Sequence, residues 1–225
     1  MLNEAAMVFL LDVDNTLLDN DRFAADLGDR VEKCFGAAQR SRYWDIFAQR
    51  RAALGLADYL GSLQEFRAGL DDDPRLLDMS HYLLEYPFAS RLFPRALEAI
   101  TYLNTLGSAV VLSDGDIVFQ PRKIQRSGIW DAVEGRVMIY VHKEKVLDHM
   151  QRRFPAKHYV MVDDKANLLA AMKSVLGAQL TTVFVRQGHY ALAPESNSVV
   201  PAPDLVIERI GDLLNHNLTD IKVRP

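Results

Sequence analysis

Residues 7–16 read MVFLLDVDNT, a short apolar run that ends abruptly in acidic residues. An unbroken apolar run of this length is typical of a strand that is buried on both faces, as in a parallel sheet. Asp12 and Asp14 follow at the point where such a strand ends. The stretch therefore predicts a buried strand over residues 7–11 that brings two carboxylates to one edge of a sheet.

Similar apolar runs recur along the chain and alternate with helical patterns. The runs cover residues 109–112, 137–141, 159–162, 182–185 and, more weakly, 205–207. Helical patterns cover residues 95–106, 119–127, 144–154 and 166–176, and each ends at a glycine or before a proline. This alternation predicts βαβ units with right-handed crossovers. The expected fold is α/β, with a three-layer, Rossmann-like core built on a parallel sheet.

Residues 18–90 interrupt the alternation, because they contain no convincing strand pattern. Apolar residues at helical spacing form four stripes instead, which begin at Phe23, Tyr43, Leu63 and Leu76. The sequence therefore predicts an all-helical cap at 18–90, inserted into an α/β catalytic core of residues 1–17 and 91–225.

Composition limits the classes of function. The 225 residues carry 26 basic and 30 acidic side chains, a formal charge of −4, which argues against nucleic acid or an anionic membrane as the main partner. A single cysteine, Cys34, excludes an intramolecular disulfide and a CxxC site. No apolar run approaches the length of a membrane span, and the first residues do not resemble a signal peptide. We expect a cytoplasmic monomer or homodimer.

Ligands of an open parallel sheet bind beyond the carboxyl ends of its strands, so the residues that follow each predicted strand are candidates. Carboxylates gathered there would repel one another unless a cation held them together. Hard oxygen ligands with room for water suit Mg²⁺. The candidate metal ligands are Asp12, Asp14, Asp163 and Asp164.

The first two of these acids fit a phosphoryl transfer. Asp12 would be the nucleophile that forms an aspartyl-phosphate. Asp14 would protonate the leaving oxygen and then activate the hydrolytic water. A lysine would stabilise charge in the transition state, and the residues after the third predicted strand offer Lys143, which we favour on spacing, and Lys145.

The remaining strand ends supply candidates for binding the phosphoryl group. Ser113 and the backbone N–H groups of Asp114 and Gly115 would hold its oxygen atoms, and Thr16 would fix the loop beside it. The acid at position 114 is unexpected beside a phosphate.

Taken in chain order, these residues resemble four motifs of the haloacid dehalogenase-like superfamily of hydrolases. The motifs are the DxDxT sequence from Asp12 to Thr16, an apolar strand ending in Ser113, a lysine at 143 or 145, and an apolar strand ending in Asp163 and Asp164. The resemblance implies a Mg²⁺-dependent phosphatase with a helical cap of the first type. It also implies that the backbone carbonyl of Asp14 and an acid of the fourth motif hold the metal.

The resemblance bears on competing functions. Members of the superfamily that cleave carbon–halogen bonds lack an acid at the position of Asp14, so its presence favours phosphate esters. A phosphomutase with the same nucleophile and a non-catalytic phosphate-binding module remain alternatives. The sequence leaves open which of Asp163 and Asp164 binds the metal.

The cap carries Arg40, Arg42, Arg50 and Arg51 beside aromatic residues. We expect a solvated helix face there. The alternative is that one of these arginines binds an acidic or phosphorylated substrate.

Overall fold

The strand predicted over residues 7–11 lies at the centre of a parallel sheet. The structure is a computed structural model that describes residues 5–216 and 218, and within them six strands form one sheet in the order β3-β2-β1-β4-β5-β6. The strands are β1 (Ala5–Leu11), β2 (Ser108–Asp114), β3 (Val137–Tyr140), β4 (Ala156–Asp163), β5 (Leu180–Val185) and β6 (Leu205–Ile207). All neighbours pair in parallel, as predicted.

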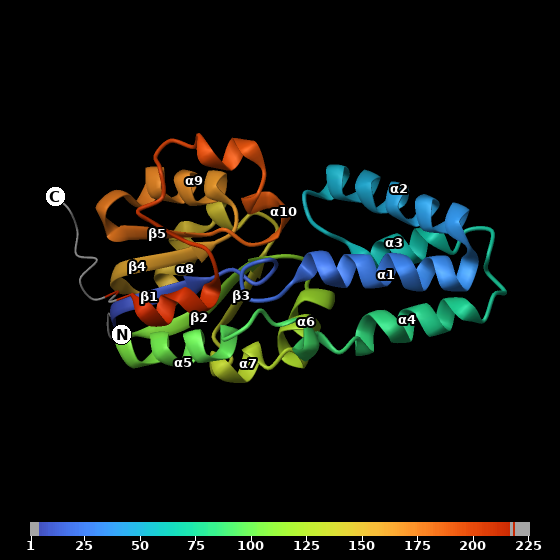
Figure 1. The fold of residues 1–225 in the computed structure, drawn as a ribbon, viewed down its shortest axis with the longest axis horizontal. Helices are drawn as coiled ribbons and strands as arrows, with labels where there is room; N and C mark the ends of the chain where they lie inside the picture. Colours follow the sequence, from blue (N-terminus) through green and yellow to red (C-terminus); the bar gives the residue numbers. More distant parts are fainter. Residues whose placement is uncertain (1–4, 217, 219–225) are drawn as a thin grey trace.

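The central strand is apolar throughout because both of its faces are covered. Phe9 and Leu11 pack into one core cluster, and Val8 and Leu10 pack into the other. Helices α5 (Ala96–Leu106), α6 (Phe119–Arg126) and α7 (Ile129–Ala132) contribute to the first cluster, whereas α8 (Leu147–Arg153) and α9 (Ala166–Leu176) contribute to the second. Figure 1 shows α5 and α9 on opposite sides of the sheet. The core is therefore the expected three-layer α/β fold.

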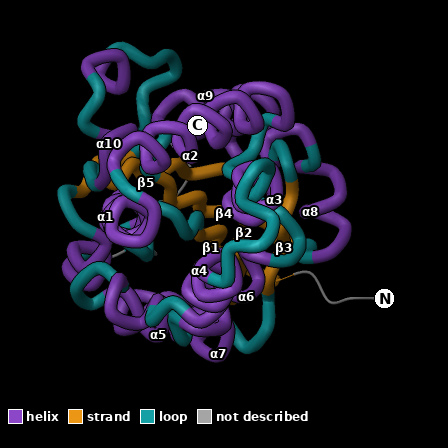
Figure 2. Tube along the Cα trace, turned by 90° about the vertical axis from the view of Figure 1, so that its right-hand side faces the viewer, coloured by secondary structure: helices purple, strands orange, loops and turns teal. Residues whose placement is uncertain are grey.

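Four of the helices between β1 and β2 extend beyond one end of the sheet (Figure 1), and Figure 2 views the molecule from that end. We call α1 (Asn20–Phe35), α2 (Ala37–Leu54), α3 (Tyr59–Phe66) and α4 (Arg75–Glu85) the helical insert. Its two connections to the sheet meet, because Leu18 forms an antiparallel bridge with Leu92. The division of the chain into two domains at the predicted boundaries, 18 and 90, stays a prediction.

Two local expectations were wrong. Residues 144–154 do not form one helix: a 3-10 turn, η2 (Lys143–Lys145), precedes α8, and the backbone of Val146, with φ −119° and ψ 27°, separates them. Leu77 belongs to the predicted apolar stripe but is 76% exposed, since α4 turns only Met79 and Leu83 fully inward.

The remaining elements of the described chain are short. They are η1 (Phe88–Arg91), η3 (Gly177–Gln179), α10 (Gly188–Ala191), η4 (Pro194–Asn197) and η5 (Ile210–Asn215). α10 follows β5 and lies where the sheet meets the helical insert (Figure 1). None of the helices in the described part of the chain has the length and apolar character needed to cross a membrane.

Candidate active site

Three carboxylates meet at the carboxyl ends of β1 and β4. The two strands pair in register, with Leu11 opposite Val162, so the residues that follow, Asp12 and Asp163, lie side by side. Asp12, Asp163 and Asp164 each present one carboxylate oxygen, and these oxygens all lie within 4.8 Å of one another. Their exposed fractions are 3%, 0% and 0%, so water does not screen their mutual repulsion.

Lys143 is buried among these acids. Its ammonium lies 2.5 Å from Asp12 Oδ1 and 2.6 Å from Asp163 Oδ2, and it also donates to the carbonyl of Leu112. Burial alone would lower the pKa of Lys143, but the carboxylates of Asp12 and Asp163 outweigh burial and raise it. Lys145 lies exposed on the same turn. Of the two lysines that the sequence left open, Lys143 is the one at the site.

One lysine does not balance three buried carboxylates. Asp12 Oδ2 and both carboxylate oxygens of Asp164 are buried without a hydrogen-bond partner. Burial, followed by the charges of Asp163 and Asp12, raises the pKa of Asp164 to about 9, and burial likewise raises the pKa of Asp163. Orphaned, hard oxygen atoms around a shared point fit a divalent cation, which would restore the ionised state of these acids.

Asp14 does not join this cluster through its side chain. Its Oδ1 lies 2.7 Å from the ammonium of Lys123, whose side chain is 1% exposed. Lys123 Nζ also donates to Asn20 Oδ1 at 2.9 Å. The ammonium is surrounded by four aromatic rings, with ring centroids at 5.5–5.9 Å, from Phe23, Tyr59, Phe88 and Phe119. Asp14 therefore has its own buried cation.

The loop after β2 lies beside Asp14. Gln120 Nε2 donates to Ser113 Oγ at 3.0 Å and lies 3.4 Å from Asp14 Oδ2. A Cβ at Gly115 would lie 2.8 Å from the Gln120 side chain, so glycine permits this approach. Burial raises the pKa of Asp114 to about 6, although its Oδ1 accepts a hydrogen bond from the Lys143 backbone N–H at 2.8 Å.

Hydrogen bonds to the Asn15 side chain stabilise the loop after β1. Asn15 adopts a positive φ of 62°, and its Oδ1 accepts hydrogen bonds from the backbone N–H groups of Asn20 and Asp21. Thr16 is fully buried, and its carbonyl accepts a hydrogen bond from Gln187 Nε2 at 3.2 Å. Thr16 thus lies below the surface of the site, whereas Asp14 and Asn15 face its pocket.

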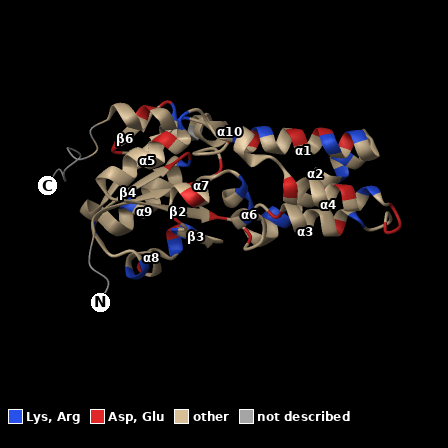
Figure 3. Cartoon of the chain, turned by 90° about the horizontal axis from the view of Figure 1, so that it is seen from below, with Lys and Arg blue, Asp and Glu red and all other residues tan. Residues whose placement is uncertain are grey.

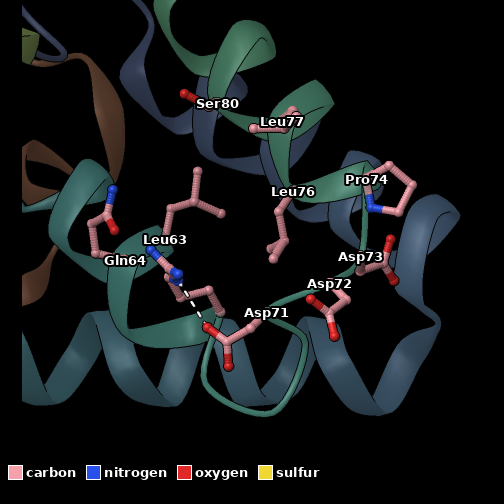
Figure 4. Close-up of a pocket in the computed structure, with 10 residues that line it drawn as sticks. Leu63, Gln64, Asp71, Asp72, Asp73, Pro74, Leu76, Leu77 and Ser80 are labelled. Carbon is pink, nitrogen blue, oxygen red and sulfur yellow. Dashed lines mark hydrogen bonds and ion pairs between the residues drawn. The ribbon is translucent and has the colours of Figure 1, made fainter.

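The site opens into a pocket of about 180 Å³ between the sheet and the helical insert. Asp14, Asp114 and Lys165 line it from the sheet edge, and Arg51 and aromatic side chains line it from the insert. A larger pocket, of about 440 Å³, lies inside the insert between α3 and α4 (Figure 4). That pocket is lined by leucines and by the acidic loop 71–73, which Figure 3 shows at the end of the insert farthest from the sheet. None of the candidate site residues lines this larger pocket.

The sequence and the fold of the chain match those of known hydrolases. A family model for haloacid dehalogenase-like hydrolases matches residues 6–175. The chain belongs to this family. Among solved structures, a haloacid dehalogenase-like hydrolase from Burkholderia xenovorans is 57% identical, with a TM-score of 0.88 over 94% of this chain and 96% of that one.

More distant haloacid dehalogenase-like structures share only the fold. The L-2-haloacid dehalogenase of Xanthobacter autotrophicus is 16% identical over 93% of this chain and 97% of that chain, with a TM-score of 0.62. The hydrolase YfnB of Bacillus subtilis, whose structure was determined with magnesium, is 15% identical over 94% and 98% of the two chains, also with a TM-score of 0.62. No curated protein matches the chain.

Several residues of this hydrolase site were not expected from the sequence. Lys123 is the main one, because no sequence pattern connects a lysine of α6 with Asp14. A weak signal exists, because Lys123 shares a helix face with Phe119 and Ile124, where a solvated lysine is out of place. Asn20 and Tyr59 reach the site only through the folding of the insert onto the sheet.

Proposed function

We propose that the protein is a Mg²⁺-dependent phosphatase that hydrolyses a small phosphorylated metabolite through an aspartyl-phosphate on Asp12. The observation that carries the proposal is the buried cluster of Asp12, Asp163 and Asp164 around the ammonium of Lys143. A structural sheet edge gains nothing from three buried carboxylates, whereas a phosphoryl-transfer site needs both an anionic nucleophile and concentrated positive charge.

Asp12 would act as the nucleophile. Lys143 holds one of its oxygens, and the other has no hydrogen-bond partner. That oxygen would attack phosphorus, and the bond between phosphorus and the ester oxygen would break. A bound Mg²⁺ would neutralise charge on the phosphoryl group and on the acids that hold it, for which Asp12, Asp163, Asp164 and the backbone carbonyl of Asp14 are the candidates.

Asp14 would transfer the protons. It would donate a proton to the leaving ester oxygen and then take one from the water that attacks the aspartyl-phosphate. Cleavage of the bond between phosphorus and Asp12 then releases phosphate and restores the free carboxylate. Ser113, with the backbone N–H groups of Asp114 and Gly115, remains our candidate for binding the phosphoryl oxygens.

Release of inorganic phosphate from p-nitrophenyl phosphate tests the proposal, with Mg²⁺ or with EDTA. We expect turnover that requires Mg²⁺ and falls at least a thousandfold in Asp12→Asn. Asp116→Asn is the matched control, since Asp116 lies on the same sheet edge but caps α6 through the N–H groups of Val118 and Phe119. It should retain activity.

Three results would overturn the proposal. Full activity in EDTA would show that the reaction does not need a metal ion. Full activity of Asp12→Asn would show that Asp12 is not the nucleophile. Chloride release from 2-chloropropionate, without phosphate release from any ester, would indicate a dehalogenase instead.

A further inference from the structure

The pocket between the sheet and the insert contains two cationic side chains without a carboxylate partner. Arg51, on α2, and Lys165, after β4, both line the pocket. Among the residues that the structure describes, neither cation has a carboxylate oxygen within 4.0 Å. Both lie against Tyr190 instead, with the Arg51 guanidinium carbon 5.4 Å and Lys165 Nζ 5.1 Å from the ring centroid. The Arg51 guanidinium also donates to the Tyr190 hydroxyl.

Arg51 differs in this respect from other arginines of the same helix. The adjacent Arg50 pairs with Asp58 at 2.5 Å, and Arg40 pairs with Glu32 at 2.7 Å. Arg42 also lacks a carboxylate partner among the described residues, but it donates to the carbonyl of Ala68 and does not line the pocket. Among these four candidates from the sequence, Arg51 alone brings an unneutralised charge to the site.

Two of the carboxylates that line the pocket are engaged by other side chains. Asp14 pairs with Lys123 at 2.7 Å. Asp21 accepts from the ring and the backbone N–H of His189, at 2.6 and 2.8 Å. Asp12, Asp163 and Asp164 interact with the charge of Lys165 from beyond 4.0 Å. A cation held by that cluster would leave Lys165, together with Arg51, available to bind an anion.

The walls of the pocket indicate which kind of molecule could carry that anionic group. The volume of about 180 Å³ is close to that of a cavity that holds one benzene ring, which favours a small substrate. Trp44, Phe47 and Tyr59 form the wall on the side of the insert. Apolar walls reduce the screening of an ion pair that lies against them, although Arg51 itself is exposed.

We infer that the substrate is a phosphomonoester of a short hydroxy acid, whose carboxylate binds between Arg51 and Lys165 while its phosphate faces Asp12. The inference rests on the proposed phosphatase function and adds the chemical class of the substrate. A planar carboxylate matches the two parallel N–H groups of a guanidinium. Because Arg51 comes from the insert and Lys165 from the sheet edge, the same carboxylate would link the two parts of the molecule.

Three two-carbon esters that differ in one group test the inference: phosphoglycolate, ethyl phosphate and phosphoethanolamine, which carry a carboxylate, a methyl group and an ammonium. We expect kcat/KM for phosphoglycolate to exceed that for ethyl phosphate at least tenfold, with phosphoethanolamine the poorest. Arg51→Gln should raise the KM for phosphoglycolate about tenfold and change that for ethyl phosphate less than twofold. Arg51→Lys should recover part of the loss, and Arg42→Gln, the matched control on the same helix, should behave as the native protein.

Calorimetric titration of Asp12→Asn with the same esters separates this inference from the proposed function. We expect this variant to bind phosphoglycolate more tightly than ethyl phosphate, and we expect the additional change Arg51→Gln to abolish the difference. This result would support the carboxylate site, whether or not any ester is hydrolysed. Equal affinity and equal kcat/KM for phosphoglycolate and ethyl phosphate, in a protein that hydrolyses p-nitrophenyl phosphate, would overturn the inference and leave the phosphatase proposal standing.

Discussion

The ion pair between Lys123 and Asp14 predicts an unequal response to the loss of either partner. The Lys123 side chain is 1% exposed, whereas that of Asp14 is 24% exposed. Asp14→Asn would leave a buried ammonium without a carboxylate. Lys123→Met would leave a carboxylate that water can reach, and it would place an apolar side chain among aromatic rings. We therefore expect Asp14→Asn to be the more destabilising change.

The magnitudes follow from the geometry. At the observed separation of 2.7 Å, and with an effective dielectric constant of about 20, the attraction is about 6 kcal/mol. Water at the exposed part of Asp14 reduces it by about half, which gives a coupling of about 3 kcal/mol. Asp14→Asn should lower the free energy of unfolding by about 3 kcal/mol. Lys123→Met loses the same attraction but no longer buries an ammonium, so its net cost should be about 1 kcal/mol or less.

Urea unfolding of the native protein, the two single variants and the double variant measures the coupling. The experiment is done in EDTA at pH 7, and unfolding is followed by far-ultraviolet circular dichroism and by tryptophan fluorescence, whose transitions must coincide for the comparison to hold. The double variant should be about as stable as Lys123→Met. A coupling below about 0.5 kcal/mol, or a Lys123→Met variant less stable than Asp14→Asn, would refute the reasoning.

Two further predictions concern stability in the metal-free protein. Burial raises the pKa of Asp114 from 3.8 to about 6, so between these pH values the folded protein keeps a proton that the unfolded chain has lost, and stability falls as pH rises. Asp114→Asn should remove this loss. After allowance for partial exposure, the variant should be more stable than the native protein by about 2 kcal/mol above pH 6, but not at pH 4. A stability difference in urea unfolding that does not depend on pH would contradict this prediction. Gly188 has a φ of 72°, and a Cβ there would lie 2.4 Å from that of Asn15, so Gly188→Ala should cost about 3 kcal/mol. Gly69→Ala, at a φ of 82° with no atom within 4 Å, should cost only about 1 kcal/mol, and equal losses in the two variants would show that the contact with Asn15 does not matter.

The fold was predictable because its signals are local. An apolar run buried on both faces identifies a parallel strand wherever it occurs, and the runs at 7–11, 109–112 and 159–162 all lie within observed strands. Helix ends were predicted less well where no strong stop signal exists. The turn at Val146 was missed, since nothing in its sequence separates a helix from a 3-10 turn followed by a helix.

The part of the site that lies at the strand ends was also predictable. Residues that directly follow strands are brought together by the strand order alone, and this placed Asp12, Asp163 and Lys143 correctly relative to one another. Lys123 and Arg51 were not predictable in this way. Their positions depend on how α6 and the helical insert pack against the sheet, which periodicity within one helix does not determine.

Two buried lysines divide the acids of the site into groups with different surroundings. Asp12 and Asp14 are only two residues apart, yet Lys143 pairs with the first and Lys123 with the second. The proposed mechanism asks for this separation: Asp12 must stay ionised in order to attack, whereas Asp14 must exchange a proton twice in each cycle. Two carboxylates that shared a single cation would compete for it, and the protonation of one would change the charge of the other. A lysine from the turn after β3 pairs with Asp12, and a lysine from α6 pairs with Asp14. Asn20 and Tyr59 of the helical insert contact the second lysine, so the position of the insert bears on the surroundings of Asp14.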